Sequence, residues 1–263
     1  MTDLHSHLLP GIDDGAKTLA DAVAMLKMQQ ADGVRTVCVT PHFYPGRETP
    51  DEFLARRAAA LEQLLPAAAP YGIRLVEGAE AAISETLPEL GRLDELCLAG
   101  SRTLLVELPV AWMPPWAESV LDELLAGGIR PLLAHVERYS YFRPDFSRLE
   151  RLVRLGCYAH VTASNVVRAD EVGKASRRML RRGLAQALGM VQTAFHKQLD
   201  ALNEFRFINL ESEMDVLADM LKSDGWTDDT PDVRDVLERE GASEPQKEED
   251  DPYAGLFSKG EKK

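Results

Sequence analysis

Two histidines stand one residue apart at the start of the chain, which reads MTDLHSHLLPGIDDG. Leucines flank the His-Ser-His triplet, so this segment is typical of a buried strand. On a strand, residues i and i+2 point to the same face, and His5 and His7 should therefore project together. Two imidazoles on one face supply half of the ligands that a metal site needs.

Further histidines and carboxylates follow at the ends of other predicted strands: Asp13, Asp14, His42 in TPHFYPG, Glu80 in EGAE, Glu107 in LLVELP and His135 in LLAHVERY. In a βα architecture these positions share the carboxyl edge of the sheet, where active sites are built. Imidazole and carboxylate ligands suit Mn, Fe, Zn or Mg better than a structural zinc site. Glu80 could bridge two ions, and Arg138 could hold phosphate oxygens bidentately. The pattern therefore favours phosphoryl transfer.

Each of these residues also has an ordinary structural explanation. An HxH triplet occurs often by chance, His42 could be a loop histidine, and Glu80 could be an exposed loop charge. Glu107 is different, because it interrupts an apolar strand and a buried carboxylate needs a partner or a metal. The metal hypothesis depends on the register of the whole set with successive strand ends.

The elements that must position these residues alternate between strands and helices. Apolar runs predict a first strand that ends at the two histidines, and later strands at 34–40, 73–80, 103–108, 130–135 and 157–162. Amphipathic runs predict helices at 19–32, 50–65, 116–126 and 146–155. This alternation predicts βα units around a parallel sheet or barrel. From 177 to 221 the sequence favours helix, with a brief strand-like exception at 205–210.

Composition argues against several classes of function. The chain has 263 residues, 45% of them hydrophobic and 28% charged, with a formal net charge of −13 and a pI near 5.0. That charge disfavours broad binding to nucleic acid or to an anionic membrane surface. We expect no membrane span and no signal peptide. Cys38, Cys97 and Cys157 lie far apart, which favours buried free thiols in a reducing cytoplasm.

The segments DLHSHLLPGIDDGAKT, TPH, EGAE, LLVELP and LLAHVERY together resemble the polymerase-and-histidinol-phosphatase (PHP) superfamily. GIDDG and HVERY resemble in particular its bacterial metal-dependent protein-tyrosine phosphatases of capsule and exopolysaccharide gene clusters. The resemblance runs from residue 1 to about 185. It implies an α/β fold of the distorted (β/α)₇ barrel type and a trinuclear centre that commonly holds manganese. It also implies hydrolysis of phosphotyrosine by hydroxide attack on phosphorus at that centre, without a phosphocysteine intermediate.

The resemblance further implies roles for individual residues and a partner. Glu80 is expected to bridge metal ions, and Arg138 to bind the phosphate and take part in catalysis. The implied substrate is the phosphotyrosine-bearing kinase of polysaccharide export, in the cytoplasm. The implied metal ligands are His5, His7, Asp14, His42, Glu80, Glu107 and His135.

The C-terminal third departs from the family pattern. The family's barrel closes with a late strand that ends in Asp-x-His and supplies the last two ligands, but no Asp-x-His occurs after residue 135. Of the later histidines, His160 is expected to line the core or a pocket, and His196 could pair with Asp200 on a helix. We therefore expect an incomplete barrel over 1–185 with an open edge, a helical segment over 186–226, and an acidic disordered tail over 227–263.

The stretch FHKQLDALNEFRFINLESEMDVLADMLKSDGW resembles a different bacterial family, which is helical, linked to hydrolysis of an indolyl phosphate and related to tellurite-resistance proteins. A gene fusion or a frameshift would explain such a junction. Three functions stay open at this point. They are an active tyrosine phosphatase, an inactive truncated or fused protein that serves as a binding module, and a small-molecule phosphoester hydrolase of the same superfamily. GIDDG and HVERY favour the first over the third.

Overall fold

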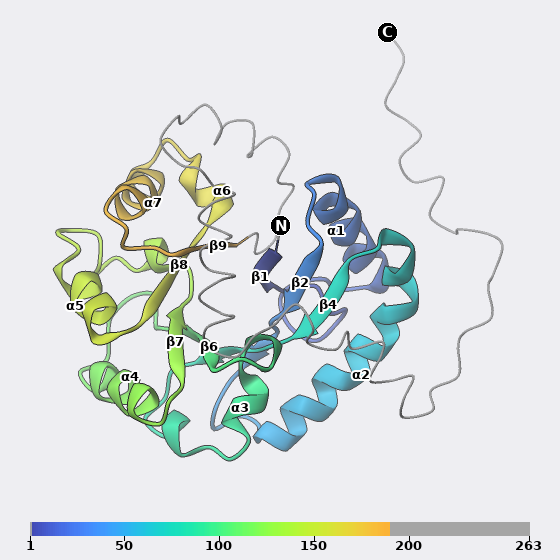
Figure 1. The fold of residues 1–263 in the computed structure, drawn as a ribbon, viewed down its shortest axis with the longest axis horizontal. Helices are drawn as coiled ribbons and strands as arrows, with labels where there is room; N and C mark the ends of the chain where they lie inside the picture. The colour runs from blue at the N-terminus through green and yellow to red at the C-terminus, as the bar shows by residue number, and fades with distance from the viewer. Residues whose placement is uncertain (1, 190–263) are drawn as a thin grey trace, which may run out of the picture.

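The computed structural model describes residues 2–189, in which strands and helices alternate along the chain (Figure 1). The strands are β1 (Thr2–Ser6), β2 (Thr36–Val39), β3 (His42–Phe43), β4 (Arg74–Glu77), β5 (Glu80–Ala82), β6 (Thr103–Glu107), β7 (Arg130–Leu133), β8 (Tyr158–Thr162) and β9 (Ala187–Gly189). The α-helices are α1 (Leu19–Ala31), α2 (Pro50–Ala68), α3 (Leu93–Leu96), α4 (Ala117–Ala126), α5 (Ser147–Leu155), α6 (Ala163–Val166) and α7 (Glu171–Arg181). Short 3₁₀ turns lie at η1 (Ala69–Tyr71), η2 (Leu87–Glu89), η3 (Leu98–Gly100) and η4 (Val136–Arg138).

Within residues 2–189 the strands pair in parallel and form two sheets, in the orders β1-β2-β4 and β3-β5-β6-β7-β8-β9. β3 follows β2 after a short break in the chain, and β5 follows β4 in the same way. We call each such pair one strand run, and the two sheets meet at these two runs. β9 lies beside β1 (Figure 1), although no strand pairing joins the two in this part of the chain. The strand runs thus follow the order expected of a (β/α)₇ barrel in a mixed α/β fold.

Packing at the centre supports this ring-like order. One cluster of buried apolar side chains receives a member from each strand run in turn: Leu4, Cys38, Val76, Leu105, Leu132, Tyr158 and Ala187. Side chains from the first and last runs can share one cluster only if those runs lie close together. A larger buried cluster joins the strands to the surrounding helices. Within the described chain, β1 and β9 therefore lie side by side and pack together, but no ladder hydrogen bonds join them.

Local signals explain where the first helices begin. Thr18 and Thr49 each accept a hydrogen bond from the backbone N–H three residues on, and the carboxylates of Asp21 and Glu52 accept one from the backbone N–H of the cap residue. These capping boxes satisfy backbone donors that the first turn of a helix leaves free. Pro50 then starts α2, as the sequence predicts.

Two expectations about the last part of the described chain are wrong. Helix was predicted onward from 177 and no closing strand was expected, but α7 ends at Arg181 and β9 then pairs with β8. Gly183 adopts a left-handed conformation (φ 65°) that favours glycine and ends the helical run. Pairing with β8 then outweighs the local helical preference. The sheet therefore continues past 185, into the predicted helical segment over 186–226. The remainder of that segment, the predicted tail over 227–263, His196 and Asp200 lie outside the described residues.

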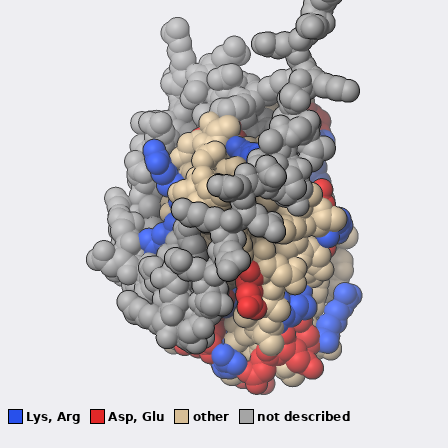
Figure 2. Space-filling view, turned by 90° about the vertical axis from the view of Figure 1, so that its right-hand side faces the viewer, with Lys and Arg blue, Asp and Glu red and all other residues tan. Residues whose placement is uncertain are grey.

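Among residues 2–189, no helix combines the length and the apolar character that crossing a membrane demands. On the face drawn in Figure 2, the described Lys and Arg side chains are scattered among acidic ones rather than gathered into a basic patch. This distribution of the described side chains agrees with the acidic pI.

Candidate metal centre

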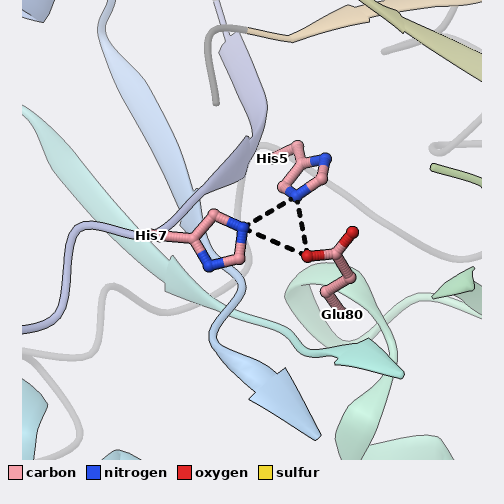
Figure 3. Close-up of side chains that lie close together, drawn as sticks. All are labelled: His5, His7 and Glu80. Atoms are coloured by element: carbon pink, nitrogen blue, oxygen red, sulfur yellow. Dashed lines mark hydrogen bonds and ion pairs between the residues drawn. The ribbon is translucent and has the colours of Figure 1, made fainter. Parts of the chain in front are cut away.

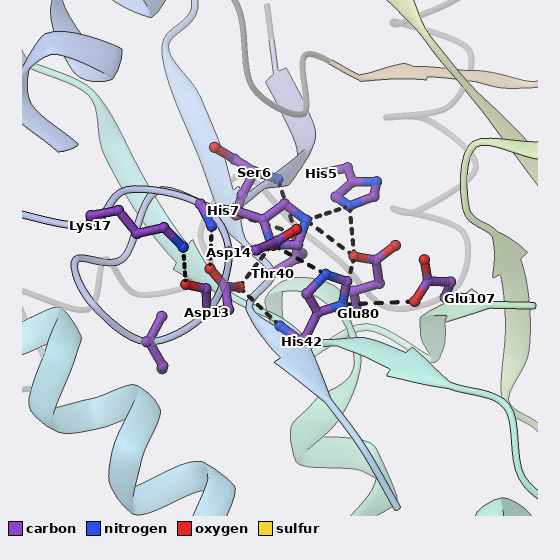
Figure 4. A network of polar contacts seen from close by, with 12 residues as sticks. His5, Ser6, His7, Asp13, Asp14, Lys17, Thr40, His42, Glu80 and Glu107 are labelled. Carbon is purple, nitrogen blue, oxygen red and sulfur yellow. Dashed lines mark hydrogen bonds and ion pairs between the residues drawn. The ribbon is translucent and has the colours of Figure 1, made fainter. Parts of the chain in front are cut away.

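Glu80 lies at the centre of the site, where its side chain is fully buried and imidazoles surround it (Figures 3 and 4). Its Oε2 atom lies 3.1 Å from His5 Nε2, 3.1 Å from His7 Nε2 and 3.2 Å from His42 Nδ1. Its Oε1 atom lies 2.9 Å from His135 Nε2. The alternative of an exposed loop charge is thereby excluded, because Glu80 begins β5 and faces the centre.

Asp14 and Glu107 complete the group of predicted ligands (Figure 4). Asp14 Oδ1 lies 3.3 Å from His42 Nε2, and Glu107 Oε1 lies 3.5 Å from His135 Nε2. The Asp14 side chain is 69% exposed, so it marks the side of the site that is open to solvent. The structure therefore brings all seven predicted ligand side chains into one cluster.

A register shift in β1 turns the first two histidines toward this cluster. Pairing with β2 is irregular between Asp3 and Ser6. Asp3 and Ser6 both accept hydrogen bonds from Gln29 of α1, so they lie on the helix side of the strand. His5 and His7 consequently lie on the other face, as the sequence predicts, with ring centroids 5.1 Å apart. Bulges of this kind re-aim side chains beside active sites.

The donor set fits divalent metal ions. His5 Nε2 and His7 Nε2 lie only 3.1 Å apart, and two imidazole lone pairs at that distance need a proton or a cation between them. Several carboxylates also share this buried space, and buried charge of one sign requires compensation. Glu80 lies at the junction of overlapping ligand groups, whose donor atoms lie within 4.8 Å of one another: His5, His7 and Glu80; His7, Asp14 and His42; and His42, Glu80 and Glu107.

Asp13 contacts a predicted ligand, and the ligand prediction did not include it. Its side chain is 4% exposed, and Oδ2 lies 2.8 Å from His7 Nδ1 while also accepting a hydrogen bond from the His42 backbone N–H. A carboxylate in this position makes Nδ1 carry the proton and leaves Nε2 free to bind a metal. A Cβ at Gly15 would lie 2.1 Å from the His7 carbonyl oxygen, so only glycine allows the loop to pack this closely against the His7 backbone. The GIDDG motif predicts a loop, but it does not show which of its two aspartates is buried.

Other contacts hold this loop and β2 in place. The Ser6 backbone N–H donates to Thr40 Oγ1 over 2.9 Å, and Lys17 Nζ donates to the Asp13 carbonyl (Figure 4). Arg56 of α2 donates to the Ile12 carbonyl over 2.8 Å and to the His42 carbonyl over 3.2 Å. Apart from Lys17 and Asp13, these partners lie far apart in sequence, so no local sequence pattern predicted the contacts.

The pKa values of the metal-free site follow from burial and pairing. Burial lowers the pKa of His5 to about 4, so its imidazole is neutral. Burial also disfavours charge on His7, but hydrogen bonds to Asp13 and Glu80 raise its pKa to about 10. Burial opposes ionisation of Glu80 too, yet the electrostatic interaction with His5 and hydrogen bonds from the surrounding histidines hold its pKa well below the usual range. Ionised Glu80 and neutral His5 are the forms that bind metals.

Arg138 lies in η4, directly beyond the loop that carries His135. It is exposed, and within the described chain its guanidinium has no hydrogen-bond or ion-pair partner. Burial and the charge of Glu80 raise the pKa of Glu107, and the positive charge of Arg138 partly offsets this effect. An unpaired guanidinium beside a carboxylate-rich site is suited to bind an oxyanion.

β8 and β9 form the remaining side of the site. His160 of β8 is fully buried, with its ring centroid 5.0 Å from that of His5, so it lines the site as expected. Burial lowers the pKa of His160 well below its usual range. β9 brings Gly189 against this pair, since a Cβ there would lie 2.2 Å from His160 Nε2. Up to Gly189, these two strands contribute no Asp-x-His.

Several known proteins are similar to this chain in sequence. The tyrosine-protein phosphatase YwqE of Bacillus subtilis is 31% identical over 169 residues, which are 63% of this chain and 66% of that protein. The tyrosine-protein phosphatase CpsB of Streptococcus pneumoniae is 30% identical over 186 residues, covering 69% of this chain and 75% of that protein. The putative tyrosine-protein phosphatase CapC of Staphylococcus aureus is 28% identical over 190 residues, covering 70% and 74%.

A solved structure has the same fold. It is described among crystal structures of YwqE from Bacillus subtilis and CpsB from Streptococcus pneumoniae, "unique metal-dependent tyrosine phosphatases". It superposes with a TM-score of 0.73 at 24% identity and covers 84% of this chain and 94% of its own. Residues 1–204 match the family described as "Capsular polysaccharide synthesis, CpsB/CapC". The match extends over most of the chain and, together with the relatives, establishes that this chain belongs to the CpsB/CapC family.

Proposed function

We propose that this chain is a metal-dependent phosphotyrosine-protein phosphatase with Mn²⁺ as its metal. The observation that carries the proposal is the approach of three imidazole nitrogens to within 3.2 Å of one buried carboxylate oxygen, Glu80 Oε2. The names of the relatives support a phosphotyrosine substrate. The substrate protein is the tyrosine kinase of capsule or exopolysaccharide export, and the reaction takes place in the cytoplasm.

In this proposal His5, His7, Asp14, His42, Glu80, Glu107 and His135 hold the metal ions. Bound divalent ions supply activation of water and neutralisation of the charge that develops on the phosphoryl oxygens. The Arg138 guanidinium binds two non-bridging phosphate oxygens and orients the phosphorus over the site. Asp13 keeps the proton of His7 on Nδ1, away from the metal side.

The cysteines support a mechanism that does not use a thiol. Cys38, Cys97 and Cys157 are all buried and free. Burial raises the pKa of each thiol, to about 12 for Cys97 and Cys157. A nucleophilic cysteine needs a lowered pKa and access to substrate, and these have neither.

The test is hydrolysis of a phosphotyrosyl peptide by the full chain with added Mn²⁺, beside a His5→Ala variant. We expect phosphate release by the wild type, near-complete loss in the variant, and loss on treatment with EDTA. Equal background in both proteins would overturn the proposal. Histidinol phosphate is assayed as an alternative substrate. A clear preference for it over the phosphotyrosyl peptide would favour the small-molecule phosphoester hydrolase.

One observation favours a second candidate, a phosphatase-derived binding module. Through Gly189, the closing strand brings a glycine rather than a ligand side chain to the site. A site that lacks ligands on one side could bind phosphotyrosine without turnover. Retention of a phosphotyrosyl peptide without phosphate release, measured by calorimetry alongside the activity assay, would favour this candidate.

A further inference from the structure

His160 makes a hydrogen bond that bears directly on a proposed ligand. Its Nδ1 atom accepts from the His135 backbone N–H over 3.0 Å, across 25 positions of sequence. Both side chains are buried, at 0% and 2% exposure, so water does not compete for this bond. The bond therefore links the end of β7 to β8 at the edge of the site.

The backbone of His135 needs such support. Its φ of 34° and ψ of 54° lie in the left-handed region, which is strained for a residue with a Cβ. A strained backbone conformation persists only where surrounding contacts hold it in place, and such conformations cluster at functional sites. At His135 the turn directs the imidazole inward, so that Nε2 reaches Glu80 over 2.9 Å.

The same hydrogen bond determines the tautomer of His160. A backbone N–H can donate to Nδ1 only if Nδ1 carries no proton, so the neutral ring carries its proton on Nε2. A protonated Nε2 is not a metal ligand. Nε2 has no hydrogen-bond partner and lies against His5 and Gly189.

From these contacts we propose that His160 is a positioning residue, which holds the left-handed backbone of His135 through Nδ1 and thereby sets the metal affinity of the centre. The inference deepens the proposed function, because it rests on the same metal site. Gly189 is part of the same arrangement, because it leaves room for the His160 imidazole. A methyl group there would overlap His160 Nε2 and come within 3.2 Å of His5 Cβ, so the imidazole and a larger residue cannot share the space.

The test compares His160→Asn with His160→Leu in the full chain. Asn and Leu have the same number of heavy atoms branched at Cγ, both remove the ring, and only Asn offers an acceptor oxygen near the former Nδ1 position. We expect His160→Leu to weaken Mn²⁺ binding by about 10–100-fold, the range for residues that orient ligands, and His160→Asn to recover most of that loss. Isothermal titration of Mn²⁺ into metal-free protein measures the affinity without reference to turnover.

A second measurement follows the hydrogen bond itself. Amide hydrogen exchange of His135 in the metal-free protein should be slow in the wild type and in His160→Asn, and fast in His160→Leu. Gly189→Ala should behave like His160→Leu, because the added methyl displaces the imidazole.

Equal Mn²⁺ affinity of the Asn and Leu variants, or an equally protected His135 amide in both, would overturn the inference. A wild type that binds Mn²⁺ tightly but hydrolyses no phosphotyrosyl peptide would overturn the proposed function alone. A wild type that binds no Mn²⁺ would overturn both.

Discussion

The two sides of the site are built differently. The first side, formed by residues 2–82, places its ligands on short strands and one tight loop, and a second residue supports each of several ligands. Asp13 bonds to His7, and Arg56 bonds to the backbone of His42. The second side, formed by residues 103–189, contributes fewer candidate ligands and holds one of them, His135, in a strained backbone conformation.

From this difference we infer that the first side determines whether a metal binds and that the second side tunes how tightly it binds. On the first side, buried carboxylates and imidazoles converge within hydrogen-bond distance of one another. On the second side, one hydrogen bond from His135 to His160 and the close packing of Gly189 take the place of additional ligands. The predictions below test this division.

The largest effect is expected at the shared carboxylate. Glu80→Gln replaces the anion that contacts three imidazole nitrogens, so we expect kcat to fall by about 10³-fold and Mn²⁺ binding to weaken severely. Steady-state kinetics and Mn²⁺ titration measure both quantities. Glu85→Gln, at an exposed position shortly after β5, is the matched control and should leave them unchanged. If Glu80→Gln retained wild-type Mn²⁺ affinity, the first side would not be the metal-binding side.

The next effect is expected at Asp13. Asn offers one acceptor oxygen, whereas Asp13 accepts from His7, His42 and Gly15 with two oxygens. Asp13→Asn should therefore raise the Kd for Mn²⁺ by about 10–100-fold while the fold is kept. Circular dichroism checks the fold and titration measures the Kd. Asp122→Asn on the exposed face of α4 is the control, and an Asp13 variant no weaker than that control would contradict the supporting role.

A smaller effect is expected at Arg138. Lys keeps the positive charge but loses the planar fork that grips two phosphate oxygens. Arg138→Lys should lower kcat/KM for a phosphotyrosyl peptide by about tenfold, mainly through KM, and leave Mn²⁺ affinity unchanged. Arg148→Lys, another exposed arginine nearby in sequence, provides the comparison. Reduced Mn²⁺ affinity in Arg138→Lys would instead place this arginine in the metal-binding part of the site.

The smallest effect is expected in the pH dependence of stability. The pKa of His7 in the metal-free fold is raised from 6.5 to about 10, so the stability it contributes is fully present below pH 6.5 and is lost as the pH rises. With EDTA, the melting temperature should fall between pH 6.5 and 8.5, by about 2–4 °C for each kcal/mol lost. With Mn²⁺ this decline should be smaller, because the metal replaces the proton. Parallel curves with and without Mn²⁺ would contradict a metal at His7.

Acid should destabilise the metal-free protein for the opposite reason. The pKa of Glu80 lies well below its usual 4.5 and that of Asp13 below its usual 3.8. Their contribution is present above those usual values and is lost as the pH falls through the folded-state values. Glu80→Gln should therefore flatten the acid limb of a melting-temperature profile, and an unchanged limb would mean that other groups control it.

The sequence by itself determined the alternation of strands and helices through residue 162 and the chemistry at the strand ends. Hydrophobic periodicity and capping residues are local signals, so the limits of β6, α4 and β8 agree with prediction within two residues. The grouping of His5, His7, His42, Glu80 and His135 followed from one rule, that parallel strands share a carboxyl edge.

Only the tertiary structure decided the rest. It selected Asp13 rather than Asp14 as the buried partner of His7 and added β9 where helix was expected. It also placed His42 in a short strand beyond the one predicted over 34–40, and it divided the strand predicted over 73–80 so that Glu80 begins a new one. It also paired His160 with His135. Each of these outcomes depends on burial or on a hydrogen bond between segments far apart in sequence. The free energy of such contacts is set by packing around the site, and no local pattern of residues encodes it.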